Sequence, residues 1–136
     1  MQKIFSHFFS VVVFVITMVV LISASTTCSA ENFKFVDAED STGYYVDMET
    51  VKIESQEIVA ATIAVVKANL NKMYTYNVRI NHKDQTYQIV SSKILEYDTR
   101  NILESNNRSR SFRPYASKSE MSELINFILH GGDLFN

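Results

Sequence analysis

Two consecutive segments of strand character constrain the fold of this chain more than any other feature. Residues 57–68 are rich in Val, Ile, Ala and Thr, and their only cation is Lys67 near the far end. Such a run is typical of a strand that is buried on both faces. Residues 73–80 alternate instead, which predicts a half-buried strand and therefore a β-sheet. The side chains on one side of this second strand are Tyr74, Tyr76, Val78 and Ile80.

The remaining segments predict further strands. Residues 85–97 have strand character, but the parity of their apolar side chains changes along the segment. A bulge near Ser91 and Ser92 would repair this mismatch by adding one residue. Residues 48–54 are predicted to form a brief turn or helical step. Short strands are expected at residues 33–37, 44–47 and 102–104.

One helix is predicted at the C-terminal end. Ser117 and Glu120 have the capping-box spacing, in which each side chain satisfies a free backbone N–H group of the other residue. Apolar residues then recur at steps of three and four until Gly131 and Gly132 end the pattern. An antiparallel meander packed by this one helix is an α+β fold. The apolar stripe consists of Met121, Leu124, Ile125, Ile128 and Leu129.

The first thirty residues predict an export signal, which would form a helix ahead of the domain. Lys3 precedes a run from Phe8 to Ile22 with only two polar members, and small side chains follow it. These are the parts of a secretory signal peptide. We expect cleavage between Ala30 and Glu31, which leaves the protein exported to the periplasm, the cell surface or the medium.

Two alternatives stay open for this segment. An uncleaved anchor is the first, because counting from Ile4 gives nearly the roughly 20 apolar residues that cross a bilayer. A lipidated Cys28 is the second, although Thr27 stands where bacterial lipoproteins normally have Gly, Ala or Ser. In both cases the protein would meet the membrane only through its N-terminal segment.

Residues 31–136 are expected to form a single domain that is held by its hydrophobic core alone. Cys28 is the only cysteine, so the chain that follows it has no thiol for a disulfide. Pro114 is the only proline, and no repeat or low-complexity tract interrupts the segment. A chain of this length can bury one modest core.

Charge is segregated along the chain. Residues 31–57 contain eight acids and two lysines, whereas residues 58–118 contain ten bases and four acids. The plain interpretation is that an acidic opening lies against a basic middle, and the sharper one is a basic face for an acidic partner. A nucleic-acid partner is not expected, because the formal net charge is −2 and no recognition motif is present.

Residues suited to catalysis or metal binding are few. His82 falls in a predicted hairpin loop, and His130 falls in the last helical turn, where a cation suits the helix dipole. Residues 37–43 resemble a calcium loop, but the glycine comes one place late and the acid at the twelfth position is missing. We therefore expect no catalytic residue, no metal and no cofactor.

The candidate partner surface is an arginine-rich segment. Arg108, Arg110 and Arg113 place three guanidinium groups within six residues, with Phe112 and Tyr115 beside them. Such a loop could hold an acidic or phosphorylated ligand. Alternatively, its aromatic rings pack as an ordinary edge segment and the arginines are solvated. Tyrosines suited to a half-wet sheet lie in the predicted strands, at Tyr44, Tyr45, Tyr74, Tyr76 and Tyr87.

The order of these elements is similar to that of a known family. A Tyr-Tyr-Val-Asp opening at residues 44–47 precedes a long apolar strand, tyrosine-bearing strands, a Tyr-Asp turn at residues 97–98 and a helix after Ser119. This order resembles the surface-adhesin protein E-like domain of small exported bacterial proteins, although that family's two cysteines are absent. The resemblance implies an α+β domain in the periplasm or on the bacterial exterior, with members implicated in adhesion to host extracellular proteins.

Three functions are therefore weighed. The leading one is a non-enzymatic exported binding or adhesion module that uses its sheet face or the Arg108–Arg113 loop. A small-ligand carrier with a tyrosine-lined pocket beneath the helix is the second, and a hydrolase built on His82 and a carboxylate is the last. The partner would be an unknown protein or host extracellular ligand. If the strand at residues 57–68 lay at the sheet edge, it could also pair with a second copy and form a homodimer.

Overall fold

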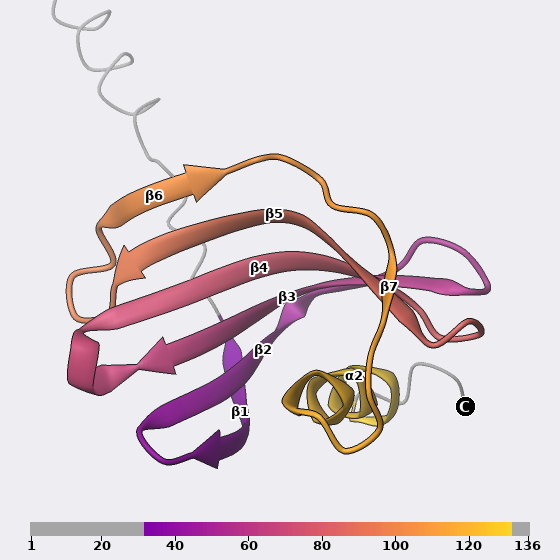
Figure 1. Ribbon diagram of the computed structural model, residues 1–136, viewed down its shortest axis with the longest axis horizontal. Helices are drawn as coiled ribbons and strands as arrows, with labels where there is room; N and C mark the ends of the chain where they lie inside the picture. Colours follow the sequence, from indigo (N-terminus) through magenta and orange to yellow (C-terminus); the bar gives the residue numbers. More distant parts are fainter. Residues whose placement is uncertain (1–31, 132–136) are drawn as a thin grey trace, which may run out of the picture. The chain divides into compact units, whose positions relative to one another are not determined.

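The fold is arranged around β3 (Ile58–Lys67), the strand formed by the apolar run. The computed structural model describes residues 32–131, and there β3 lies between β2 (Thr42–Ile53) and β4 (Lys72–Asn81), antiparallel to both (Figure 1). The prediction that this strand is buried on both faces is confirmed. Its buried side chains point to the two faces in turn: Val59, Ala61 and Ile63 to one, Ala64 and Val66 to the other.

The sheet is an antiparallel meander in chain order. β1 (Phe33–Glu39) flanks β2, while β5 (Thr86–Glu96) and β6 (Ile102–Asn106) extend the sheet beyond β4. The two-residue strand β7 (Arg113–Pro114) pairs with the beginning of β5, and β6 pairs with its end. The predicted α+β class, with a meander and one C-terminal helix, is therefore confirmed for the described residues.

The bulge predicted from parity is present in β5. Ser91 and Ile89 pair with adjacent residues of β4, so Val90 is the extra residue. This insertion brings Ile94 to the same face of the sheet as Tyr87, as the parity argument required.

The prediction of a turn or helical step at residues 48–54 is wrong, because β2 continues to Ile53. Its pairing with β3 is irregular between Asp47 and Lys52. Side-chain hydrogen bonds bridge this irregular stretch. The Thr50 hydroxyl donates to the Asp47 carbonyl at 2.7 Å and accepts the Thr62 N–H at 2.8 Å. A local polar side chain thus replaces part of the backbone ladder and keeps the strand in the sheet.

The helix α2 (Glu120–His130) begins later than the capping-box spacing predicted. Ser119, not Ser117, is the N-cap, and its hydroxyl oxygen accepts the Ser122 N–H at 3.2 Å. Lys118 has a φ of 64°, a left-handed conformation that cannot continue a right-handed helix toward Ser117. The predicted apolar stripe is confirmed, with Leu124, Ile125 and Ile128 buried.

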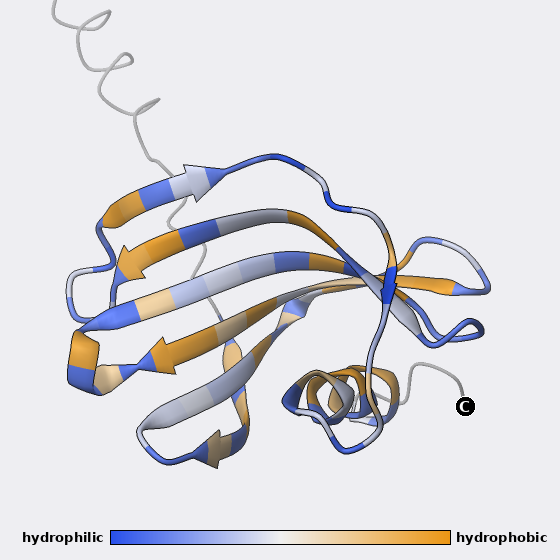
Figure 2. Ribbon diagram, in the orientation of Figure 1, coloured by the Kyte–Doolittle hydropathy of each residue, from blue (hydrophilic) through white to orange (hydrophobic). Residues whose placement is uncertain are grey.

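The helix packs on one face of the sheet, which we call the helix face. Figure 2 shows hydrophobic residues along β3 and on α2. Leu124, Ile125 and Ile128 join the side chains of four strands in the main core. The opposite face carries a smaller core of Ala64, Val66, Met73 and Leu95, with Phe33 and Tyr45 beside it. The strand residues of the main core are Val46, Val59, Ala61, Ile63, Val78, Ile80, Tyr87 and Ile89.

Several predictions for the two ends of the chain fall outside the described residues. These are the signal peptide, its cleavage between Ala30 and Glu31, the retained anchor and the lipidated Cys28. Within residues 32–131, no helix has the length and apolar character needed to cross a membrane. The condition for a dimer contact through residues 57–68, a position at the sheet edge, is not met, because β2 and β4 already occupy both edges of β3.

Truncating the helix stripe tests the packing of α2. Ile128→Ala should lower the free energy of unfolding by about 2–5 kcal/mol, because Ile128 is fully buried in the main core. Asn126→Ala, at an exposed position of the same helix, should change it by less than about 0.5 kcal/mol. Urea denaturation of the full chain measures both, and equal effects would contradict the docking of α2 on the sheet.

Candidate functional site

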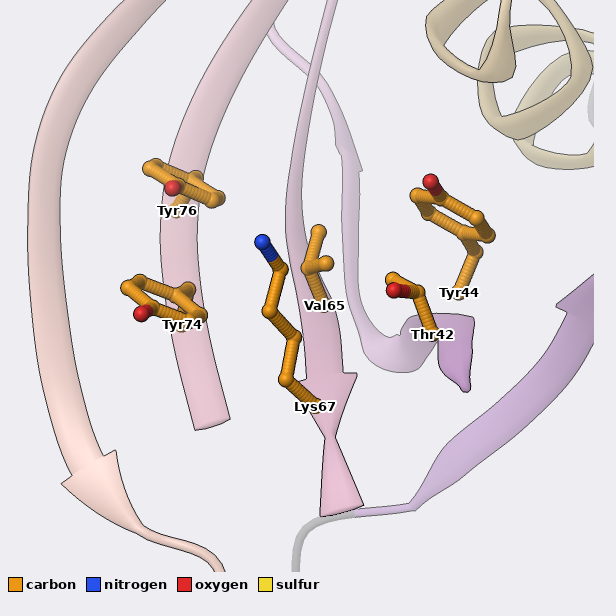
Figure 3. A pocket seen from close by; sticks show the side chains of 6 residues that line it. All are labelled: Thr42, Tyr44, Val65, Lys67, Tyr74 and Tyr76. Atoms are coloured by element: carbon orange, nitrogen blue, oxygen red, sulfur yellow. The ribbon is translucent and has the colours of Figure 1, made fainter. Parts of the chain in front are cut away.

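The helix leaves part of the helix face uncovered, and an open groove lies there. Side chains from β2, β3 and β4 line it, and its volume is about 270 Å³ (Figure 3). The groove is open to solvent. We call it the tyrosine groove, and its lining residues are Thr42, Tyr44, Val65, Lys67, Tyr74 and Tyr76.

Strand register brings these side chains together. Tyr44 pairs with Val65, and Val65 pairs with Tyr74, so the three form one row across the sheet. Thr42 pairs with Lys67 in the next row. Residues directly opposite each other in antiparallel strands share a face, so both rows point into the groove. The alternation of side chains along each strand therefore decides which residues point to the helix face. The pairing of β2, β3 and β4 decides which of these residues lie next to each other in the groove.

Lys67 supplies the cation of the groove. Its ammonium nitrogen lies 5.9 Å from the centroid of the Tyr74 ring, within the range of a cation–π contact. Figure 3 shows the nitrogen between the β4 tyrosines and Val65. The two ion pairs found among residues 32–131 are formed by Arg79 with Glu54 and by Lys83 with Glu57, so neither involves Lys67. The Lys67 charge is therefore available to an anion.

The charge of Arg110 acts on Tyr76 of the groove. Burial raises the pKa of Tyr76, and the neighbouring Tyr74 raises it further, while the Arg110 charge lowers it in part. Tyr76 therefore stays a neutral hydroxyl group at pH 7. The backbone of Arg110 is held on β5, where its N–H donates to the Ile89 carbonyl at 2.9 Å.

Acidic side chains lie beside the β2 side of the groove, where Glu39 of β1 pairs with Thr42. A hydrogen bond to the Glu120 carboxyl raises the pKa of Glu39, and the Glu120 charge raises it further. Burial raises the pKa of the Tyr44 hydroxyl, and the charges of Glu120 and Glu39 add to this effect. The tyrosine groove thus has a cationic side at Lys67 and an acidic side near Tyr44.

The structure gives the four predicted partner residues different environments. The Arg113 guanidinium carbon lies 4.8 Å from the centroid of the Tyr87 ring. Tyr115 is half-buried and packs against the main core. Arg108 is exposed, and its N–H donates to the Asn106 side chain. Of the four, Arg110 is the one whose charge lowers the pKa of Tyr76, a tyrosine of the groove.

Hydrogen bonds from β5 also hold this arginine-rich segment. The Gln88 side-chain amide donates to the Arg110 carbonyl at 2.8 Å and to the Ser109 hydroxyl at 3.0 Å. The segment therefore runs along the β5 edge, and Tyr115 packs as the alternative of an ordinary edge segment predicted, whereas Phe112 is exposed.

The histidines lie away from the tyrosine groove. His82 follows the far end of β4, and its Nε2 lies 2.8 Å from the Gln56 carbonyl oxygen, in the loop between β2 and β3. His130 is exposed in the last turn of α2. Among residues 32–131, no three His, Cys, Asp or Glu side chains gather in a group that could hold a metal ion.

Sequence reasoning found the tyrosines of the groove but not their companions. Tyr44, Tyr74 and Tyr76 were expected on a sheet face, and a pocket beneath the helix was one hypothesis. The structure places the groove on the part of that face beside α2. Lys67 and Thr42 were missed, although Lys67 is the only cation of its strand and shares the parity of the buried residues of the helix face.

The comparisons with known proteins identify no relative. No protein-family model matches this chain, and no similar curated protein or solved structure was found. The resemblance to the surface-adhesin domain therefore stays a prediction.

Removing the Glu120 charge tests the acidic side of the groove. The folded state holds the Glu39 proton more tightly than the unfolded state does, because the pKa of Glu39 is raised above 4.5 on folding. The free energy of unfolding therefore decreases as the pH rises from 4.5 to the pKa of Glu39 in the folded state. Glu120→Gln should lower the Glu39 pKa toward 4.5. It should also be more stable than Glu123→Gln at neutral pH, and this advantage should disappear as the pH falls below 4.5.

Glu123→Gln is the matched control, because Glu123 is an exposed acid of the same first helical turn. Both variants lose a carboxylate of the first turn that interacts favourably with the helix dipole, so the contact with Glu39 is the main difference between them. NMR titration of the Glu39 carboxyl group and thermal denaturation at acid and neutral pH give the two readouts. A Glu39 pKa that does not change in Glu120→Gln would contradict the contact.

Proposed function

We propose that this chain is a non-enzymatic exported binding module, and that the tyrosine groove is its binding site. One observation carries the proposal: three tyrosines and Lys67 line an open groove on a sheet face that the helix covers elsewhere. Concave sites with aromatic side chains and a few convergent polar groups are the usual places of ligand binding. Tyrosine suits such a site, because it offers both an apolar ring and a hydroxyl group.

The size of the groove supports a binding or adhesion module more than a carrier. Its volume is about 270 Å³, and pockets that bury most of a drug-sized ligand range from roughly 300 to 1,000 Å³. An open groove of this size accepts one ring of a larger molecule. A protein that attaches to a ligand on a surface needs such a site, because the rest of the ligand stays outside the groove. A small-ligand carrier is the second candidate, and the tyrosine lining is the observation that favours it.

The position of the histidines supports binding over hydrolysis. The groove is formed near the beginning of β4, at Tyr74 and Tyr76, whereas His82 follows the end of that strand. A general base has to lie within hydrogen-bond reach of the group from which it takes a proton. His82 is therefore not placed to act on a ligand in this groove.

Mapping with small probes tests the location of the site. We expect that phenol, glucose or benzoate, added to the isotope-labelled full chain, shifts the backbone amide NMR signals of the groove residues most strongly. Tyr74→Ala should reduce these shifts, whereas Tyr97→Ala, at an exposed tyrosine outside the groove lining, should keep them. Shifts that cluster at residues 108–113, or that do not cluster, would contradict the assignment of the groove as the binding site.

The intact mass of the protein tests the export part of the proposal. Protein from an envelope fraction and from culture fluid should have a mass that begins at Glu31, because small side chains precede this residue after the apolar run. A mass that includes Met1, or a lipidated Cys28 at the N-terminus, would contradict a free exported domain and indicate a membrane-tethered one.

A further inference from the structure

We propose that the ligand of the tyrosine groove is an acidic sugar residue of a glycan chain, bound by stacking on the tyrosine rings and by a salt bridge to Lys67. This inference rests on the proposed function, since it names the ligand class of the same site. Four features of the groove support it: its hydroxyl groups, its cation, its opposed charges and its size.

The lining of the groove is amphipathic rather than apolar. Tyr44, Tyr74 and Tyr76 offer ring faces and phenol hydroxyl groups, and Thr42 adds a fourth hydroxyl group. Val65 is the only lining side chain without a polar atom. A purely apolar ligand would leave these hydroxyl groups without partners, which is costly. A sugar ring has an apolar C–H face and a rim of hydroxyl groups, so it complements both parts of the lining.

The Lys67 ammonium selects for a negative charge. It lies over the Tyr74 ring and takes no part in the ion pairs found among residues 32–131. A hydrogen bond between an ammonium group and a carboxylate is stronger than one between neutral groups. The charge of Arg110, which acts on Tyr76, adds to the attraction of an anion. A neutral sugar could accept a hydrogen bond from Lys67 but would form no ion pair with it and would not be attracted by the Arg110 charge.

The acidic side of the groove fixes the orientation of such a ligand. Glu39 of β1 pairs with Thr42 beside Tyr44, and the charges of Glu39 and Glu120 act on the Tyr44 hydroxyl, so they repel a second negative charge near it. A ligand carboxylate is therefore directed toward Lys67, at the other side. The carboxylates of the protein accept hydrogen bonds, so the hydroxyl groups of the sugar suit the side near Tyr44.

The size of the groove indicates that it binds one sugar residue. It is too small to enclose a whole oligosaccharide. A volume of about 270 Å³ accommodates a single ring with its substituents. Because the groove is open to solvent, the neighbouring residues of a glycan can continue out of it. This geometry fits a polysaccharide that contains uronic acid.

Tyrosine fluorescence of the full chain provides the test. The chain contains seven tyrosines and no tryptophan, so its intrinsic emission reports on tyrosine surroundings. The probes are trigalacturonic acid and its fully methyl-esterified form, which keeps the sugar rings and loses the charges. We expect the acid to bind about tenfold or more tightly than the ester, since a charged hydrogen bond is lost in the ester. This preference should decrease as the salt concentration rises.

Two lysine variants locate the charge. Lys67→Gln should weaken binding of the acid by about tenfold and leave binding of the ester unchanged. Lys93→Gln is the matched control, because Lys93 is exposed and pairs with Thr75, on the face opposite to the groove. It should bind the acid as the original chain does. The urea midpoint of each variant shows that a loss of affinity is not a loss of folding.

The outcomes separate this inference from the proposed function. Equal binding of acid and ester, or equal losses in Lys67→Gln and Lys93→Gln, would overturn the acidic sugar. Binding of benzoate but of neither sugar probe would overturn it in favour of an aromatic acid. If nothing binds in this assay but the amide mapping still places phenol or glucose in the groove, the acidic sugar is overturned and the binding module stands. If the mapping also fails, both are overturned.

Discussion

The burial of β3 on both faces is the constraint on which the other elements depend. Ile63 is 1% exposed and its neighbour Ala64 is 0% exposed, although they point to opposite sides of the sheet. Each face therefore needs its own cover. The helix covers one face, and Phe33 and Tyr45 pack beside the small core of the other. Because residues 32–131 contain no cysteine, this burial is the main source of stability for the described domain.

The direction of α2 explains why a groove exists. In Figure 1 the helix is seen nearly end-on, whereas the strands run across the view, so α2 crosses the strands instead of following them. The helix therefore covers only part of the length of the strands, and the rest of the helix face has to meet water. Tyrosine and lysine suit this uncovered part, because each combines an apolar body with a polar end.

The segregated charges of the sequence have two roles in the structure. The acidic opening meets the basic middle in the ion pairs of Arg79 with Glu54 and of Lys83 with Glu57, as the plain interpretation predicted. Lys67 is outside these pairs and lies in the tyrosine groove. In the sharper interpretation, a basic face binds an acidic partner. The structure offers Lys67, in the tyrosine groove, for this role rather than a whole basic face.

The sequence by itself determined the features that depend on local periodicity. These are the strands, the bulge that left Val90 unpaired in β5, and the apolar stripe of α2, because the alternation of side chains is encoded within each segment. Only the tertiary structure decided the central place of β3, the separate environments of Arg110 and Arg113, and the meeting of Tyr44 with Tyr74. Such neighbours lie far apart in the chain, and strand order and register bring them together, which no single segment specifies.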